Sequence, residues 1–273
     1  MTFATLLVHL ELGRLNTGLL RVAGDLAERF HAELIGIAAC QPMRVDFGDS
    51  YVSGDIFEQD REEIGKDIAA AEAEFRSALQ AQGRRIAWRS AISFEALADY
   101  LAREARRADL VVTGIPSSDA IVATRRADIG DLVMQAGRPV FIVPAAADGL
   151  KLERAVIAWK DRREARRAVL DALPLLQMAA QVVVVEIAAE DGLAEARTHT
   201  DDVVDWLKRH RVIAESLVPI ATGDDALQLN EIVQEGDIIV AGAYGHSRMR
   251  EWAFGGVTRD ILLRGRHCAL VSH

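Results

Sequence analysis

The chain repeats itself, and this internal repeat limits its fold more than any other feature of the sequence. The segment RADLVVTG, from Arg107 to Gly114, resembles EGDIIVAG, from Glu235 to Gly242. The segment AGRPVFIV, which begins at Ala136, resembles RGRHCALV, which begins at Arg264, and both pairs lie 128 positions apart. Two matches at one spacing indicate a duplicated structural unit, so every motif has to be compared with its copy.

Each half alternates short apolar runs of β type with longer helical patterns. TLLVHLE opens the first half and AVIAWK the second, and a helical pattern with one apolar face follows each of them. Most of the predicted strands are continuous apolar runs, which are typical of parallel sheets covered by helices on both faces. We therefore predict an α/β protein with two doubly wound, parallel, five-stranded sheet domains of Rossmann-like type in tandem.

The boundary between the two predicted domains lies in PAAADGLKLER, from Pro144 to Arg154, whose Pro, Ala and Gly content suits a short linker. We expect one domain at 1–146 and a second at 151–273. The segment from Gln41 to Gly54 is the other irregular stretch, and we expect a long loop there. Later strands are expected near Ile86 to Arg89, Val212 to Val218, Leu110 to Thr113 and Asp237 to Ala241.

Composition excludes several classes of protein. Half of the residues are hydrophobic and 27% are charged, which is the balance of a packed globular protein. The formal charge of -9 argues against a general affinity for nucleic acid or for anionic membranes. Two cysteines, Cys40 and Cys268, are too few for a disulfide framework, so we expect both to be reduced. No secretory signal or membrane span is evident, and the expected location is the cytoplasm.

A glycine-rich loop, GAYGHSRMREWAFGGVT, runs from Gly242 to Thr258 and directly follows an apolar strand. In open parallel sheets, ligands bind beyond the carboxyl ends of strands, where a following helix offers unpaired N–H groups to an anion. The glycines leave room for a phosphate, and Arg248 and Arg250 could add charge to its binding. The loop is neither a Walker loop nor a dinucleotide fingerprint, and glycine-containing loops are also common without any ligand.

With its two βαβ-rich halves and the spacing Gly242-x2-Gly245-x9-Gly255, the chain resembles a tandem universal stress protein over its whole length. The resemblance implies an adenine-nucleotide-hydrolase-like fold and a site in the second half for ATP or ADP, with or without Mg²⁺. It implies phosphate contacts from the glycine loop and adenine contacts from the backbone near Val185 to Ile187. The candidate ligand-binding residues are Gly242, Gly245, His246, Ser247, Arg248, Gly255, Gly256, Val257, Thr258, Val185, Ile187 and Lys160.

Two positions of the second half depart from the family pattern. Gly256 stands where the family has Ser or Thr, which removes a hydroxyl that would contact phosphate. Lys160 stands where the family has Asp after the first strand, with Asp161 one place later. Lys160 is either a phosphate contact or an ordinary exposed lysine at the end of a strand.

The first half departs further from the pattern. The offset of 128 sets Ser117 opposite Gly245, Ala127 opposite Gly255 and Asp128 opposite Gly256, and a carboxylate in that place repels phosphate. After the first strand, Leu10 falls opposite Lys160, and the acidic residue, Glu11, comes one place late. We predict that this half does not bind a nucleoside triphosphate in the family manner.

No catalytic or metal-binding motif stands out. The sequence contains no H-E-x-x-H, and the H-x-E triplets at His9 and His31 lack the P-C-x-x-C of a zinc deaminase. His246 and Ser247 have no evident paired acid for general acid–base work. We therefore assign no catalytic residue and no metal ligand, and slow ATP hydrolysis remains an interpretation without a recognisable base.

The sequence thus predicts a stress-response protein that binds an adenine nucleotide in its second half and acts by regulation or by binding an unidentified protein partner. The alternative is a scaffold of the same fold that binds no nucleotide. The apolar last strand of each half, RPVFIVP and HCALVSH, would be exposed at a sheet edge if unpaired. The resemblance implies that these strands pair within the chain as a pseudo-dimer, and a homodimer of two chains is also open.

Overall fold

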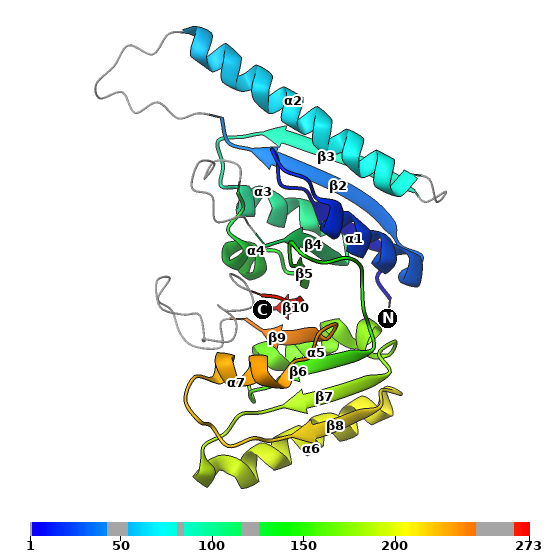
Figure 1. Ribbon diagram of the computed structural model, residues 1–273, viewed down its shortest axis with the longest axis vertical. Coiled ribbons are helices and arrows are strands. Elements are labelled where there is room, and N and C mark those ends of the chain that lie inside the picture. The colour runs from blue at the N-terminus through cyan, green and yellow to red at the C-terminus, as the bar shows by residue number, and fades with distance from the viewer. Residues whose placement is uncertain (1, 43–53, 81–84, 116–125, 244–264) are drawn as a thin grey trace, which may run out of the picture.

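The computed structural model describes residues 2–42, 54–80, 85–115, 126–243 and 265–273 (Figure 1). Within these residues, ten strands form one continuous sheet in the order β3-β2-β1-β4-β5-β10-β9-β6-β7-β8. Each half supplies five consecutive strands of this order, and the expected fold class of two doubly wound parallel units is confirmed.

In the first half, each strand is followed by a helix or by the link to the next unit. Its strands are β1 (Thr5–His9), β2 (Glu33–Cys40), β3 (Ile86–Ile92), β4 (Leu110–Gly114) and β5 (Val140–Val143). Its helices are α1 (Thr17–Phe30), α2 (Gly54–Leu79), α3 (Leu97–Glu104), the short 3-10 helix η2 (Ala105–Arg107) and α4 (Ile129–Gln135).

The second half repeats this order. Its strands are β6 (Arg154–Ala158), β7 (Gln181–Val185), β8 (Ala214–Leu217), β9 (Ile238–Gly242) and β10 (Cys268–Ser272). Its helices are α5 (Arg163–Leu176), the short 3-10 helix η4 (Glu190–Gly192), α6 (Leu193–Arg209) and α7 (Asp225–Ile232). The segment that follows the glycine-rich loop, as far as residue 264, lies outside the described residues, as does most of the loop expected from Gln41 to Gly54.

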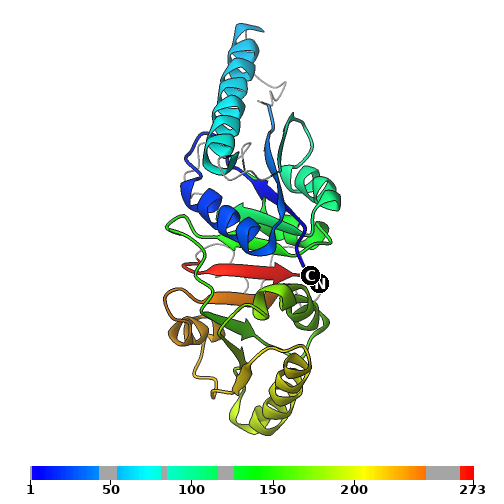
Figure 2. The same cartoon turned by 90° about the vertical axis from the view of Figure 1, so that its right-hand side faces the viewer.

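The two halves join through their last strands. β5 and β10 pair in antiparallel fashion, with Phe141 opposite Leu270, and every other pairing of neighbouring strands in the sheet is parallel. Figure 2 shows β10, in red, between the two halves. This is the intramolecular pairing expected for the two apolar edges, and it removes both of them from solvent.

Helices cover both faces of the sheet. One apolar layer contains residues of α1, α2, α5 and α6, and the other contains residues of α3, α4 and α7. Successive residues of each strand point to opposite layers, as in β4, where Val111 belongs to the second layer and Val112 to the first. Burial on both faces explains why the strands read as continuous apolar runs.

The repeat holds closely in three dimensions, with one local shift. Leu6 of β1 pairs with Leu110, and Ala155 of β6 pairs with Ile238, so the partners in β4 and β9 are 128 positions apart. In the last strands the spacing is 129, because Val111 pairs with Val140 whereas Ile239 pairs with Ala269. The sequence match of these last strands is therefore one residue out of the structural register.

Three further sequence expectations concern the linker, the cysteines and the membrane. No helix or strand is assigned between Val143 and Arg154, as expected for a linker. Neither Cys40 nor Cys268 forms a disulfide, and burial raises the pKa of the Cys268 thiol to about 12. In the described part of the chain, no helix is both long and apolar enough to cross a bilayer.

Candidate functional site

The sheet has two points at which the strand order reverses, one in each half. They lie between β1 and β4 and between β6 and β9, because the chain leaves the first strand of each unit toward one side and later returns to its other side. In doubly wound sheets, ligands bind at the carboxyl ends of the strands at such points. We call the two places the first cleft and the second cleft.

Strand register shows which residues correspond between the two clefts. Glu11 lies five residues after Leu6, and Lys160 lies five residues after Ala155, the two residues that occupy equivalent positions in β1 and β6. The structural counterpart of Lys160 is therefore Glu11, and the alignment that set Leu10 opposite Lys160 is wrong by one residue. Equivalent positions in the two clefts thus carry opposite charges.

Lys160 lies at the end of β6 and reaches across to the end of β7. Its Nζ atom donates a hydrogen bond to the backbone carbonyl of Ile187. It also lies 3.7 Å from Oδ2 of Asp225, the first residue of α7. Lys160 therefore contacts the very backbone segment that the sequence resemblance implied for adenine.

The end of β7 is closely tied to its neighbours in the sheet. The carbonyl of Val185 accepts a hydrogen bond of 2.8 Å from the N–H of Trp159. Val185 and Ile187 are both buried, at 2% and 5% exposed. The Ile187 carbonyl belongs to the backbone segment expected to contact adenine, and in this structure it accepts a hydrogen bond from the Lys160 ammonium group.

Gly242 ends β9 and fits against the start of α5. A Cβ atom at this position would lie 2.5 Å from the backbone N of Ala165 and 2.5 Å from the backbone C of Glu164. Real Cβ atoms do not approach backbone so closely, so only glycine fits here without a shift of the helix. At the equivalent Gly114 of the first half, the nearest atom to an added Cβ is the carbonyl oxygen of Val143, at 3.9 Å.

Loop length accounts for this difference between the two glycines. Seven residues, 10–16, connect β1 to α1, whereas four residues, 159–162, connect β6 to α5. The shorter connection holds the first turn of α5 against the end of β9. The longer one leaves room between α1 and β4, and this room is the first cleft.

Most of the predicted phosphate loop lies outside the described residues, which end at Ala243 and resume after 264. The candidate residues in that segment are Gly245, His246, Ser247, Arg248, Gly255, Gly256, Val257 and Thr258. Of the twelve candidates, the structure therefore places Lys160, Val185, Ile187 and Gly242, and it brings these four together at the carboxyl ends of β6, β7 and β9.

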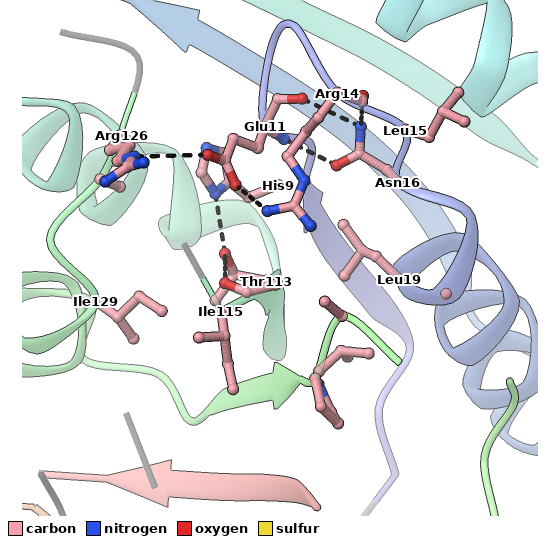
Figure 3. Close-up of a pocket in the computed structure, with 16 residues that line it drawn as sticks. His9, Glu11, Arg14, Leu15, Asn16, Leu19, Thr113, Ile115, Arg126 and Ile129 are labelled. Atoms are coloured by element: carbon pink, nitrogen blue, oxygen red, sulfur yellow. Dashed lines mark hydrogen bonds and ion pairs between the residues drawn. The ribbon is translucent and has the colours of Figure 1, made fainter. Parts of the chain in front are cut away.

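The first cleft contains a cavity of about 40 Å³ at the ends of β1 and β4 (Figure 3). In its wall, Nδ1 of His9 lies 3.0 Å from the Thr113 hydroxyl oxygen. Burial lowers the pKa of His9 to about 4, so its ring is neutral at neutral pH. The second half has Ala158 and Ala241 at the equivalent strand positions, so it lacks this polar pair.

Charged side chains line the mouth of the first cleft. Figure 3 shows Glu11 between two arginines: Arg14 Nη1 lies 2.9 Å from Glu11 Oε2, and Arg126 Nε lies 3.8 Å from Glu11 Oε1. Asn16 fixes the loop that carries Glu11, because its Oδ1 accepts a hydrogen bond from the Glu11 N–H and its Nδ2 donates to the Glu11 carbonyl. The loop is thus held in one conformation by its own side chains.

The sequence analysis did not single out Arg14, Asn16 or Arg126. None of them belongs to a recognisable motif, and Arg126 reaches Glu11 only because β4 lies beside β1 in the sheet. The position of Asn16 just before an apolar helical pattern was the one signal in the sequence that could have drawn attention to it, because Asn is common at helix N-termini.

Asp128, expected to repel phosphate, has a definite structural role. Its Oδ1 accepts a hydrogen bond of 2.8 Å from the N–H of Asp131, so it caps the N-terminus of α4. Ala127 lines the first cleft, and Ser117 lies outside the described residues. Among the residues that the structure describes, no group of three or more His, Cys, Asp or Glu side chains could hold a metal ion.

These features define a class of protein: a duplicated, doubly wound α/β chain in which the strand order reverses once in each half. Solved structures with this architecture are universal stress proteins. One, from Archaeoglobus fulgidus DSM 4304, is 12% identical, with coverage of 98% of this chain and 95% of that chain and a TM-score of 0.70. Another, described as a universal stress protein of Pseudomonas aeruginosa UCBPP-PA14, is 12% identical, with coverage of 99% and 93% and a TM-score of 0.65.

The chain therefore has the fold of a tandem universal stress protein, and the resemblance seen in the sequence is confirmed at the level of the fold. Half of the chain, 52%, also matches a universal stress protein from Archaeoglobus fulgidus that was determined in complex with dAMP; it is 16% identical, and the match covers 99% of that chain with a TM-score of 0.35. Neither a protein-family model nor a curated protein sequence matches the chain.

Proposed function

We propose that this chain is a stress-response protein that binds an adenine nucleotide, ATP or ADP, in its second cleft. It acts in the cytoplasm, through a nucleotide-dependent change in its binding of a protein partner rather than through catalysis. The carrying observation is the exchange of charge between the two clefts, with Lys160 in the second where Glu11 stands in the first.

The two clefts differ in the group that stands beside the end of the first strand of each unit. Lys160 places an ammonium group beside the ends of β6 and β7, and its side chain is 53% exposed, so it can turn toward a bound phosphate. In the first cleft, Glu11 forms ion pairs with both Arg14 and Arg126, and the cavity of about 40 Å³ has room for a few water molecules rather than a nucleotide.

Nucleotide binding in the second cleft requires Lys160 to change its partner. An adenine amine donates hydrogen bonds, and the Ile187 carbonyl is the acceptor at the end of β7 that Lys160 occupies. When the base takes this carbonyl, the Lys160 ammonium is released to contact phosphate. Mg²⁺ would bind to phosphate oxygens and water, because these are the ligands it prefers.

One observation favours the alternative of a scaffold without nucleotide. The contact of Gly242 with α5 requires a glycine at this position for packing alone. One of the glycines in the family pattern therefore has a purely structural explanation. In this alternative, the chain keeps its fold and its binding of a protein partner but binds no nucleotide.

Calorimetry with ATP and with adenosine tests the proposal. Lys160→Met should weaken ATP binding by about tenfold, because a charge-assisted contact of this kind contributes roughly 1.5 kcal/mol, and should leave adenosine binding unchanged or tighter. Gly245→Val should remove ATP binding, and Arg14→Met, in the first cleft, is the matched control that should change neither ligand. Absence of binding in the wild-type chain would favour the scaffold, and tighter ATP binding by Lys160→Met would show that the lysine only obstructs the cleft.

Association of two chains belongs to the same proposal. Light scattering coupled to size exclusion, with and without ATP, would measure the mass directly. A monomer at every concentration would remove the homodimer from the proposal and leave the nucleotide site intact.

A further inference from the structure

A second cavity lies in the second half, between helices α5 and α6. Its volume is about 420 Å³, which is in the range of small-molecule sites. Its apolar lining includes Trp159, Trp206, Val203 and Leu170, and Leu170 is 41% exposed although it is a large apolar residue. On this side of the sheet, the cavity contains none of the candidate nucleotide-binding residues.

The cavity exists because the second half lacks a side chain that the first half has. In α2, Phe75 is fully buried and lies four residues before Leu79, against Gly36 and Trp88 of the neighbouring strands. In α6, Val203 lies four residues before the equally buried Leu207. Helices α1 and α2 pack against each other, whereas α5 and α6 make no comparable contact along their described lengths. A smaller side chain and a wider separation leave the space open.

Buried polar groups at this cavity lack partners. Trp159 is 5% exposed, and its Nε1 donor makes no hydrogen bond within the described residues. Behind the cavity wall, Glu186 Oε2 lies 3.8 Å from His199 Nδ1, without a hydrogen bond to it, and burial raises the pKa of Glu186. Unpaired polar atoms in a well-packed interior are uncommon, and a ligand that fills the cavity is one way to satisfy them.

The charges around the cavity favour a cation. Arg166 is held by two hydrogen bonds to Asp161 Oδ1, at 3.1 and 2.8 Å, so this pair contributes no net charge. Asp202 also lines the cavity, where it is an exposed residue. Two indole rings and a carboxylate are groups that attract an organic ammonium ion.

We propose that the cavity between α5 and α6 binds a small organic cation, an amine or substituted ammonium carried on an aromatic or branched apolar body. The apolar body packs between Trp159, Trp206 and Val203, and the ammonium group pairs with Asp202. None of the candidate nucleotide-binding residues lines this site, and the proposal goes beyond the nucleotide-binding function.

Three probes of one shape test the chemistry of the site: 2-phenylethylamine, 2-phenylethanol and phenylacetate at pH 7, titrated by NMR of the tryptophan indole N–H signals. A Trp206→Phe variant assigns the signal of Trp206. We expect the amine to bind at least tenfold more tightly than the alcohol, and the acid to bind most weakly. Equal binding of amine and alcohol, tighter binding of the acid, or no shift with any probe would overturn the proposal.

Two variants separate charge from shape. Asp202→Asn should weaken amine binding at least fivefold and leave alcohol binding unchanged, because it removes the charge and keeps the size. Val203→Phe introduces the ring that the first half has at Phe75 and should abolish binding of all three probes. Both variants should bind ATP as the wild-type chain does, so a failure of the nucleotide proposal leaves this test unaffected. Unchanged amine binding in Asp202→Asn would contradict the proposed pairing.

Discussion

The two halves of the sheet share one topology and differ in how their helices meet it. In the first half, a seven-residue connection holds α1 away from β4 and leaves a cleft, while Phe75 fills the space under α2. In the second half, a four-residue connection seats α5 on Gly242, while Val203 leaves a cavity beside α6. The strand order is the same in the two halves, but differences in loop length and side-chain size leave the open space beside the start of α1 in the first half and between α5 and α6 in the second.

The largest expected effect concerns the filled and unfilled spaces under α2 and α6. Phe75→Ala should lower the free energy of unfolding by about 3–5 kcal/mol, because it removes a fully buried ring. Val203→Ala, at the equivalent but half-buried position, should cost about 1 kcal/mol. Urea unfolding monitored by circular dichroism measures both. Equal losses would mean that the two helices are packed alike.

The next effect concerns His9, which has no polar counterpart in the second half. Burial lowers the pKa of His9 in the folded chain to about 4, from its ordinary value of 6.5. As pH falls below 6.5, the unfolded chain therefore takes up the proton first, and stability is lost between pH 6.5 and 4. The loss should be roughly 2–3 kcal/mol by pH 4.5.

His9→Asn should flatten this part of the pH dependence, as measured by urea unfolding at pH 7 and pH 4.5. His31→Asn is the matched control: His31 is exposed and has a φ of 54°, a conformation that asparagine adopts readily. If both variants kept the wild-type pH dependence, His9 would not be the group that titrates.

A smaller effect separates the two strand-end glycines. Gly242→Ala should cost about 1–3 kcal/mol, because its methyl group would meet the backbone of Glu164 and Ala165. Gly114→Ala should change stability by no more than about 0.5 kcal/mol, because its methyl group meets nothing closer than 3.9 Å. Thermal melts of the two single variants make the comparison. A Gly114→Ala variant as unstable as Gly242→Ala would contradict the role assigned to loop length.

The smallest expected effect distinguishes the two charge clusters. Glu11 is 17% exposed and lies between two arginines, so Glu11→Gln should cost about 1 kcal/mol. The Lys160–Asp225 pair is 53% and 40% exposed, so Asp225→Asn should cost no more than roughly 0.3 kcal/mol. In unfolding measurements, the difference between the two losses should be larger in 1 M NaCl than in low salt, because salt screens the more exposed pair and leaves the partly buried one less affected. A larger loss for Asp225→Asn would reverse this ranking.

Much of the fold could be predicted from the sequence. Buried parallel strands must be apolar on both faces, so continuous apolar runs in the sequence mark them. The internal repeat supports these assignments, because a strand in one half is expected to have a counterpart in the other. The pairing of β5 with β10 followed from the family resemblance and from the apolar character of both last strands. The one-residue shift in the last strands could not be predicted, because Phe141 and Ala269 match in the sequence alignment while Phe141 and Leu270 match in the sheet.

The candidate sites were only partly predictable. The glycine spacing pointed to the end of β9, and the structure gathers Lys160, Ile187 and Gly242 there. The sequence alone could not show that Lys160 binds the Ile187 carbonyl, because the two residues lie 27 positions apart and meet only when β6 and β7 pair. The residues of the first cleft and of the cavity beside α6 likewise come from segments that only the sheet and its helices bring together.

The sequence by itself thus determined the duplicated α/β architecture and the strand after which the glycine-rich loop begins, because both depend on local patterns of apolar residues and glycines. The tertiary structure alone decided that Glu11 corresponds to Lys160, that Gly242 is required by α5, and that the second half contains an open aromatic cavity. These properties depend on distances between segments that are far apart in the chain, and such distances are set by loop length and packing.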